Sequence, residues 1–253
     1  MPRLLVRPPS SRLAEGELTH LERVPVDPAL AREQWEAYVD VFRARGWEIV
    51  PVAEADEQAD GVFVEDAVVV FGDLAVLCRA GADSRRGERP TIEAATARTG
   101  LATAEIAAPA TLDGGDVLKI GRTVYVGLSA RTTEDAVAQL RALLEPRGWD
   151  VQGVPVTRVL HLKSAVTALP DGTVIGYPPL VDDPDAFPAF LPVPEEHGTA
   201  VVVLDENTVL MSADAPGSAA LFRERGLEVI TTPVTEFEKL EGCVTCLSVR
   251  LRD

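Results

Sequence analysis

The pentapeptide RGWEI at residues 45–49 recurs as RGWDV at residues 147–151 and as RGLEV at residues 225–229. Each copy follows a stretch with helical periodicity, and each is followed within a few residues by Pro-Val. A glycine behind a helix commonly adopts the left-handed conformation that ends it, and the apolar residue after it can enter a strand. The sequence therefore predicts a repeated helix-to-strand junction, with a weaker fourth copy at residues 98–101.

Predicted helices and hairpins surround these junctions. Residues 27–45 and 133–147 begin with Asp-Pro and Thr-Glu-Asp, which favour helix starts, and both continue with apolar residues at helical spacing. Between the helices lie pairs of apolar runs joined by turn residues, which predict hairpins. The pairs are residues 62–70 with 74–78, 117–120 with 123–127, 165–169 with 173–176, and 200–204 with 208–211. A fifth pair is split between the ends of the chain, residues 244–251 and 4–7.

The chain is thus organised as roughly five strand–strand–helix–strand units, one of them degenerate around residues 181–194. Units that cannot bury their own apolar face are expected to close around a pseudo-axis. We predict an α/β fold, a five-bladed α/β-propeller formed by a single domain over residues 1–253. The alternative is one irregular α/β sandwich. A closed ring further predicts that side chains distant in sequence meet at its centre.

Composition excludes several classes of function. The 253 residues contain 24 Lys and Arg against 40 Asp and Glu, a formal net charge of −16, so we expect no nucleic-acid partner. No stretch approaches the ~18 apolar residues of a membrane span, and the opening residues MPRLLVRPPS lack the pattern of a signal peptide. Three cysteines are too few for a disulfide framework. We therefore expect a cytoplasmic protein with no membrane partner.

Four short stretches place polar residues against apolar surroundings. They are DGVFVED at residues 60–66, TLDGGDVL at 111–118, HLKSAV at 161–166 and EGCVTCLSV at 241–249. Each lies where a unit begins its inner hairpin. Together they supply a thiol, an imidazole and several carboxylates at one repeated structural position.

The order of these motifs resembles the dimethylarginine dimethylaminohydrolase family of guanidino-modifying enzymes. The likeness covers nearly the whole chain and includes FVED at 63–66, GADSRR at 81–86, LDGGDVL at 112–118, GLSxRT at 127–132 and HLKS at 161–164. The resemblance implies the pentein fold, a five-bladed α/β-propeller. It also implies hydrolysis of methylated arginine (asymmetric dimethylarginine or monomethylarginine) to citrulline and dimethylamine or methylamine, with no cofactor and no metal.

The resemblance assigns the chemistry to Cys246, His161 and Asp113. Cys246 would attack the guanidinium carbon, which splits a difficult hydrolysis into two covalent steps through a thiouronium intermediate. His161, held by Asp113, would protonate the departing amine and then activate water. Asp66, with Glu65, would bind the planar guanidinium through paired hydrogen bonds. Because nearby carboxylates should raise the pKa of Cys246, we expect the cationic substrate itself to favour the thiolate.

The resemblance also implies how the rest of the substrate is bound. Arg85 and Arg131 would bind its α-carboxylate, while Asp60 and the backbone carbonyl of Leu18 would receive its α-ammonium. Leu18 would lie on a mobile lid that excludes water. Leu240 would border the pocket.

Cys243 has no role in this scheme. With Cys246 it forms Cys-x-x-Cys, a pattern also found in redox and zinc sites. A redox motif should open a helix, whereas residues 247–251 resemble a terminal strand, and a tetrahedral zinc site needs four ligands. A Cys243–Cys246 disulfide formed under oxidation is a further hypothesis.

Other functions remain open on the same fold. An arginine deiminase is the nearest alternative, although the chain has no room for the helical insertion of the deiminases and carries Glu65-Asp66 where an Arg-Asp-type motif is expected. An amidinotransferase, or an inert pentein that only binds partners, are the others. An inert pentein would have no reason to keep Cys246, His161 and Asp113. Chains of this fold often form homodimers, but no pattern here specifies a dimer surface.

Overall fold

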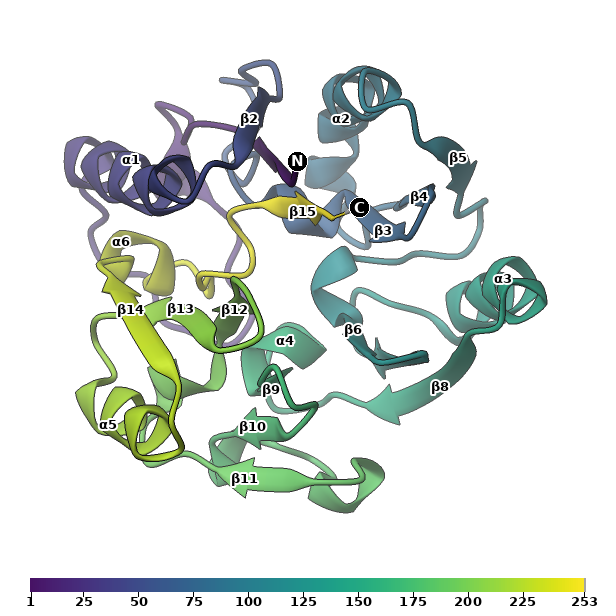
Figure 1. The fold of residues 1–253 in the computed structure, drawn as a ribbon. Helices are drawn as coiled ribbons and strands as arrows, with labels where there is room; N and C mark the ends of the chain where they lie inside the picture. Colours follow the sequence, from purple (N-terminus) through teal and green to yellow (C-terminus); the bar gives the residue numbers. More distant parts are fainter. Residues whose placement is uncertain (253) are drawn as a thin grey trace.

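The computed structural model describes residues 1–252, which form five three-stranded sheets arranged in a ring (Figure 1). In every sheet the first strand pairs antiparallel with the middle strand, and the middle strand pairs parallel with the third. The sheets, each from first to third strand, are β15–β1–β2 (Val249–Leu251, Arg3–Val6, Glu48–Pro51), β3–β4–β5 (Val68–Phe71, Leu74–Leu77, Ala102–Glu105), β6–β7–β8 (Val117–Ile120, Thr123–Leu128, Asp150–Pro155), β9–β10–β11 (Val166–Ala168, Val174–Gly176, Phe190–Pro192) and β12–β13–β14 (Val201–Val203, Thr208–Ser212, Glu228–Thr232). The predicted pairing of the two chain ends in one sheet is confirmed.

Helices connect the parallel strands in four of these five units and lie on the outside of the ring (Figure 1). A parallel pair requires such a crossover. The four helices are α1 (Pro28–Ala44), α2 (Arg89–Ala97), α3 (Glu134–Leu144) and α5 (Pro216–Glu224). In the unit predicted to be degenerate, the connection from β10 to β11 instead contains two 3-10 turns, η6 (Pro178–Leu180) and η7 (Pro184–Ala186).

Local sequence signals set the helix boundaries. The carboxylate of Asp27 accepts hydrogen bonds from the backbone N–H groups of Ala29 and Leu30, so α1 begins where the Asp-Pro pair predicts. All four predicted junctions end in a glycine with positive φ, a conformation that disfavours other residues. These angles are 75° at Gly46, 76° at Gly100, 77° at Gly148 and 87° at Gly226.

The apolar core is divided among the wedges between neighbouring sheets. Successive residues of a strand point to opposite faces, and in β1 both faces are buried. Leu4 packs in a cluster with Phe42 of α1, whereas Leu5 packs in a different cluster with Val68 and Ala75 of the next sheet. The ring is therefore held together by apolar contact between adjacent sheets.

Two predicted strands are too long. In the run 62–70 the strand is only Val68–Phe71, because residues Val64–Asp66 form the 3-10 turn η2. In the run 244–251 the strand is only Val249–Leu251, and Cys246 lies in the turn before it. Both runs contain polar side chains that the turn directs to separate partners, which an alternating strand would not do.

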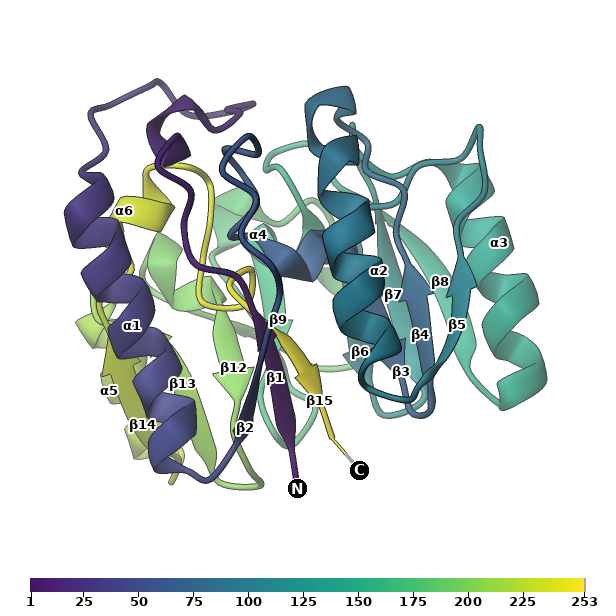
Figure 2. The ribbon, with the colours of Figure 1, turned by 90° about the horizontal axis from the view of Figure 1, so that it is seen from above.

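The same arrangement recurs in the other units. Short helical turns precede the first strands β6, β9 and β12, and they are η4 (Gly114–Asp116), α4 (Leu162–Ala165) and η8 (Glu196–Thr199). Figure 2 shows the long loop before α1 at one end of the ring and both termini at the other. The remaining short helices are η1 (Leu13–Glu15), η3 (Asp83–Glu88), η5 (Glu145–Arg147) and α6 (Thr235–Glu238). Across residues 1–252, no helix has the length and hydropathy that a bilayer crossing demands.

Candidate active site

A pocket beneath the loop before α1 gathers side chains from distant parts of the sequence. Of the ten site residues that the sequence predicts, seven line it: Asp60, Asp66, Arg85, Arg131, His161, Leu240 and Cys246. An eighth, Asp113, contacts His161 and is fully buried. The turns η2 and α4, and the turn that holds Cys246, each come directly before the first strand of a sheet, which explains why these side chains meet at one end of the ring.

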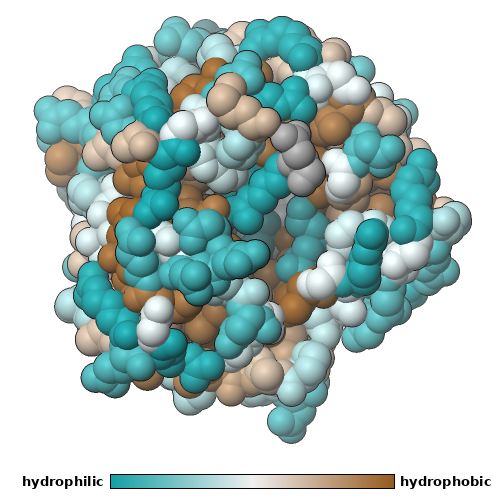
Figure 3. Space-filling view, in the orientation of Figure 1, coloured by the Kyte–Doolittle hydropathy of each residue, from teal (hydrophilic) through white to brown (hydrophobic). Residues whose placement is uncertain are grey.

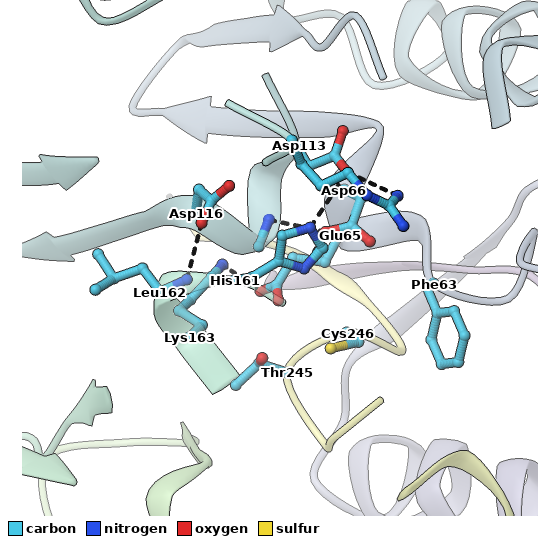
Figure 4. A network of polar contacts seen from close by, with 12 residues as sticks. Phe63, Glu65, Asp66, Asp113, Asp116, His161, Leu162, Lys163, Thr245 and Cys246 are labelled. Atoms are coloured by element: carbon cyan, nitrogen blue, oxygen red, sulfur yellow. Dashed lines mark hydrogen bonds and ion pairs between the residues drawn. The ribbon is translucent and has the colours of Figure 1, made fainter. Parts of the chain in front are cut away.

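His161 lies between two carboxylates (Figure 4). Its Nε2 is 3.2 Å from Oδ2 of Asp113, and its Nδ1 is 3.7 Å from Oδ1 of Asp66. Burial acts to lower the pKa of His161, but the charge of Asp66, the hydrogen bond with Asp113 and the charge of Asp116 raise it to about 9. The imidazole is therefore protonated at neutral pH and can supply a proton.

Asp66 is held in its charged form. Burial acts to raise its pKa, but the charges of His161 and Arg85 and a hydrogen bond from the backbone N–H of Gly115 lower it to about 2. The bond from Nη1 of Arg85 to Oδ2 of Asp66 is 2.6 Å long. A carboxylate this strongly ionised is suited to binding a cation.

Gly115 allows these groups to approach one another. A Cβ atom at this position would lie 2.5 Å from Nδ1 of His161 and 2.7 Å from Oδ1 of Asp66, closer than packed atoms tolerate. The glycine pair of the DGGD stretch thus serves close backbone approach, as no nucleotide-loop spacing surrounds it.

Asp116 orients the segment that carries His161. Its Oδ1 accepts the backbone N–H of Leu162 at 2.8 Å, and its Oδ2 accepts the hydroxyls of Ser129 and Thr132, both at 2.7 Å. The carboxylate is fully buried. It therefore fixes the start of α4, and with it the place of the imidazole. The sequence analysis assigned this residue no role.

Cys246 lies in a turn, with its side chain largely buried. Its Sγ is 3.4 Å from Sγ of Cys243, and both cysteines are free thiols. The hydrogen bond with Cys243, burial and the nearby carboxylates Glu65 and Asp66 raise the pKa of the Cys246 thiol well above its ordinary value. In the ligand-free pocket the sulfur is protonated at neutral pH.

The two predicted carboxylate-binding arginines differ in their surroundings. Arg85 is buried, donates to both carboxylate oxygens of Glu88 at 2.7 and 3.0 Å, and also bonds Asp66. Arg131 donates through Nη2 to Oε2 of Glu17 at 3.2 Å, on the loop that covers the pocket. The guanidinium of Arg85 is thus largely occupied by protein groups, whereas Arg131 faces a carboxylate that can move away with the loop.

Two predicted residues lie outside the pocket lining. Oε1 of Glu65 bonds Nζ of Lys163 at 2.7 Å and Nη2 of Arg250 at 2.9 Å, and this side chain lines a different cavity. Because Glu65 and Asp66 are adjacent in a 3-10 turn, they point to different sides. The side chain of Leu18 packs against the apolar core. The structure therefore does not bring the Glu65 carboxylate to the predicted guanidinium site.

A latch on the covering loop was missed by the sequence analysis. The carboxylate of Glu241 accepts the backbone N–H groups of Thr19, His20 and Leu21 at 2.8, 2.6 and 3.2 Å. Glu241 itself has a positive φ of 59°, which is unusual for a residue with a side chain. The covered pocket has a volume of about 20 Å³, room for about one water molecule. Its position beside Cys243 in the EGCVTCLSV stretch was the available signal.

A group of potential metal ligands lies outside this pocket. Within residues 1–252, His197, Asp214 and Glu238 place one ligand atom each within 4.8 Å of one another. Nδ1 of His197 is 3.2 Å from Asp214 and 3.6 Å from Glu238. The sulfur, imidazole and carboxylates of the pocket do not belong to this group.

Comparison with known proteins identifies relatives across the whole chain. The family model for eukaryotic N,N dimethylarginine dimethylhydrolase matches residues 23–166. An N(G),N(G)-dimethylarginine dimethylaminohydrolase from Streptomyces coelicolor is 59% identical over 98% of this chain and 96% of its own. One from Pseudomonas aeruginosa is 33% identical over 98% of both chains.

Solved structures agree with these sequence relatives. The Pseudomonas aeruginosa dimethylarginine dimethylaminohydrolase in complex with citrulline superimposes with a TM-score of 0.91 at 30% identity, covering 98% of both chains. A dimethylarginine dimethylaminohydrolase adduct with S-methyl-L-thiocitrulline gives a TM-score of 0.90 at 30% identity, covering 99% of this chain and 100% of the other.

Proposed function

The chain belongs to the dimethylarginine dimethylaminohydrolase family, and on that premise we propose that it hydrolyses asymmetric dimethylarginine and monomethylarginine to citrulline and dimethylamine or methylamine. It is a hydrolase of the C–N bond in a linear amidine. The observation that carries the proposal is the pocket in which Cys246, His161 and Asp66 meet. The ring of five sheets then corresponds to the single-domain α/β-propeller of the penteins, and we place the enzyme in the cytoplasm.

The reaction begins at the guanidinium carbon. Asp66 binds the planar cation, and the sulfur of Cys246 attacks the carbon to form a C–S bond. As the C–N bond to the methylated nitrogen breaks, its electron pair takes the proton of His161, and the amine leaves as a neutral molecule. The product of this half-reaction is a thiouronium covalently bound to Cys246.

Water completes the reaction. His161, now neutral, accepts a proton from a water molecule whose oxygen attacks the same carbon. Collapse of the tetrahedral adduct breaks the C–S bond, returns the electron pair to the sulfur of Cys246 and releases citrulline. Asp113 holds the imidazole in place through both half-reactions, and its charge favours the protonated ring that each cycle must regenerate.

Substrate charge resolves the high pKa of the nucleophile. A thiolate beside carboxylates is disfavoured in the empty pocket, but a guanidinium placed between Asp66 and Cys246 adds a positive charge beside the sulfur. We therefore propose that the substrate promotes ionisation of Cys246. Titration of the thiolate absorbance at 240 nm with and without a cationic substrate analogue tests this step, and an unchanged pKa of Cys246 would contradict it.

The two charged ends of the amino acid have separate partners. We propose that the α-carboxylate of the substrate replaces Glu17 on Arg131, while Asp60 and the carbonyl of Leu18 receive its α-ammonium. Arg85 supports this site from beneath, because its bonds to Asp66 and Glu88 fix the guanidinium-binding carboxylate.

The remaining predicted residues act at the edges of the pocket. Leu240 borders it, whereas Glu65 acts indirectly through the placement of η2. The small pocket volume requires that the loop over it open before substrate enters. The proposed ligand is a small guanidino compound, with no cofactor in the scheme.

Citrulline release tests the assignment. Wild-type protein and Cys246→Ser are incubated with asymmetric dimethylarginine, monomethylarginine and arginine, and citrulline is quantified. We expect turnover of both methylated substrates by the wild type and none by the variant. Release from arginine alone would favour the deiminase alternative, and release from none of the three would refute the hydrolase assignment.

A further inference from the structure

A second cavity occupies the opposite end of the ring. It has a volume of about 330 Å³, shares no lining residue with the active-site pocket, and is lined by the first strand of every sheet, β3, β6, β9, β12 and β15. We call it the rear chamber; besides these strands its lining includes Glu65, Lys163, Thr245, Ser248 and Arg252. Figure 3 looks onto this face and shows a central hollow bordered by hydrophilic side chains.

The charge of the rear chamber opposes that of the whole chain. Four basic side chains line it, Lys119, Lys163, Arg250 and Arg252, against the single carboxylate of Glu65. The excess is three positive charges in a protein of formal net charge −16. Clefts lined by one sign of charge concentrate ions of the opposite sign, so this is a place where an acidic protein attracts anions.

The inner end of the chamber is internally balanced. Lys163 and Arg250 both bond the same oxygen, Oε1 of Glu65, at 2.7 and 2.9 Å. Arg250 is further committed to the backbone carbonyls of Thr245 and Ser248. Oε2 of Glu65 is buried and has no hydrogen-bond partner, so this inner end accepts a hydrogen-bond donor.

The outer end carries cations that this carboxylate does not neutralise. Nζ of Lys119 donates to the carbonyl of Val70 at 2.6 Å, and Arg252 donates to the carbonyl of Val203. Within residues 1–252, neither side chain has a carboxylate oxygen within 4.0 Å. Backbone carbonyls satisfy hydrogen bonds but carry no full charge, so both cations retain capacity for an anion.

We propose that the rear chamber binds a small multivalent oxyanion, for which orthophosphate is the simplest probe, between Lys119 and Arg252. A lysine supplies a compact charge and an arginine supplies paired donors, a combination suited to tetrahedral oxyanions. A protonated oxygen of the same anion can donate toward Oε2 of Glu65. The guanidino substrate is excluded from this chamber by its positive charge, so the site differs in ligand class from the active-site pocket.

Isothermal titration calorimetry with orthophosphate tests the proposal. Titrations at pH 7 and constant ionic strength compare wild type, Lys119→Gln, Arg252→Gln and the double variant. We expect one site per chain in the wild type, about tenfold weaker binding in each single variant and no measurable binding in the double variant. Lys119→Arg, which keeps the charge, should retain binding. Arg147→Gln, at an exposed cation outside the chamber, serves as the matched control.

Controls separate the alternatives. Thermal unfolding of every variant verifies the fold before titration, and citrate in place of phosphate shows whether recognition requires a phosphoryl group or charge alone. Undetectable binding to the wild type, or equal binding to the double variant, would overturn the proposal. The measurement requires no turnover, so its outcome is independent of the hydrolase assignment.

Discussion

Replacing Asp113 by Asn isolates the charge that keeps His161 protonated. The substitution preserves the size of the side chain, and its oxygen can still accept the backbone N–H of Gly81, which Oδ1 of Asp113 now accepts at 2.9 Å. It removes the negative charge 3.2 Å from Nε2 of His161, in a place where both side chains are buried. Asp66 and Asp116 remain, so part of the raised pKa should persist.

The size of the effect follows from the contact. A hydrogen bond to a charged group contributes about 1.5–3 kcal/mol, which at 1.36 kcal/mol per pH unit corresponds to about one to two units. We therefore expect the pKa of His161 to fall from about 9 to about 7–8 in Asp113→Asn. Since the protonated ring donates to the leaving amine, the decline of kcat/KM at alkaline pH should begin lower by the same amount.

Histidine NMR measures this shift directly. The chain has three histidines, so the ring signal of His161 can be assigned by comparing spectra of His20→Gln and His197→Gln. Asp214→Asn is the matched control, because it removes a carboxylate at the same 3.2 Å distance from the more exposed His197. That variant should leave the titration of His161 unchanged. If Asp113→Asn also leaves it unchanged, the charge of Asp113 does not stabilise the imidazolium, and the reasoning fails.

Three further predictions concern the surroundings of the nucleophile. Glu241→Gln weakens the three hydrogen bonds that hold the covering loop, so KM should rise several-fold and hydrogen exchange at residues 19–21 should accelerate; unchanged exchange would contradict the latch. Peroxide should join Cys243 and Cys246 in a disulfide, consuming two thiols and one peroxide with release of two waters, because their sulfurs are 3.4 Å apart. Activity should return with dithiothreitol, and thiol counting should show no such loss of two thiols in Cys243→Ser. Gly115→Ala should abolish citrulline release and lower the free energy of unfolding by about 1–3 kcal/mol, measured in urea, because its Cβ would collide with His161. Wild-type activity in this variant would show that the close approach is dispensable.

Local sequence determined the repeated parts of the fold. A capping aspartate, a glycine in the left-handed conformation and a turn between two apolar runs each act within a few residues, so their effects can be predicted without knowing what lies nearby. The start of α1 at Asp27 and the junctions at Gly46 and Gly226 follow from such signals. The motifs also indicated which side chains gather at one end of the ring.

Tertiary structure alone decided how those side chains are used. Glu65 and Asp66 are neighbours of the same chemical type, yet one bonds Lys163 in the rear chamber and the other faces His161. Glu241 holds a loop more than 200 residues earlier in the chain. Such pairings depend on which distant segments ring closure brings together, and the electric field at each carboxylate is set by those neighbours and by burial.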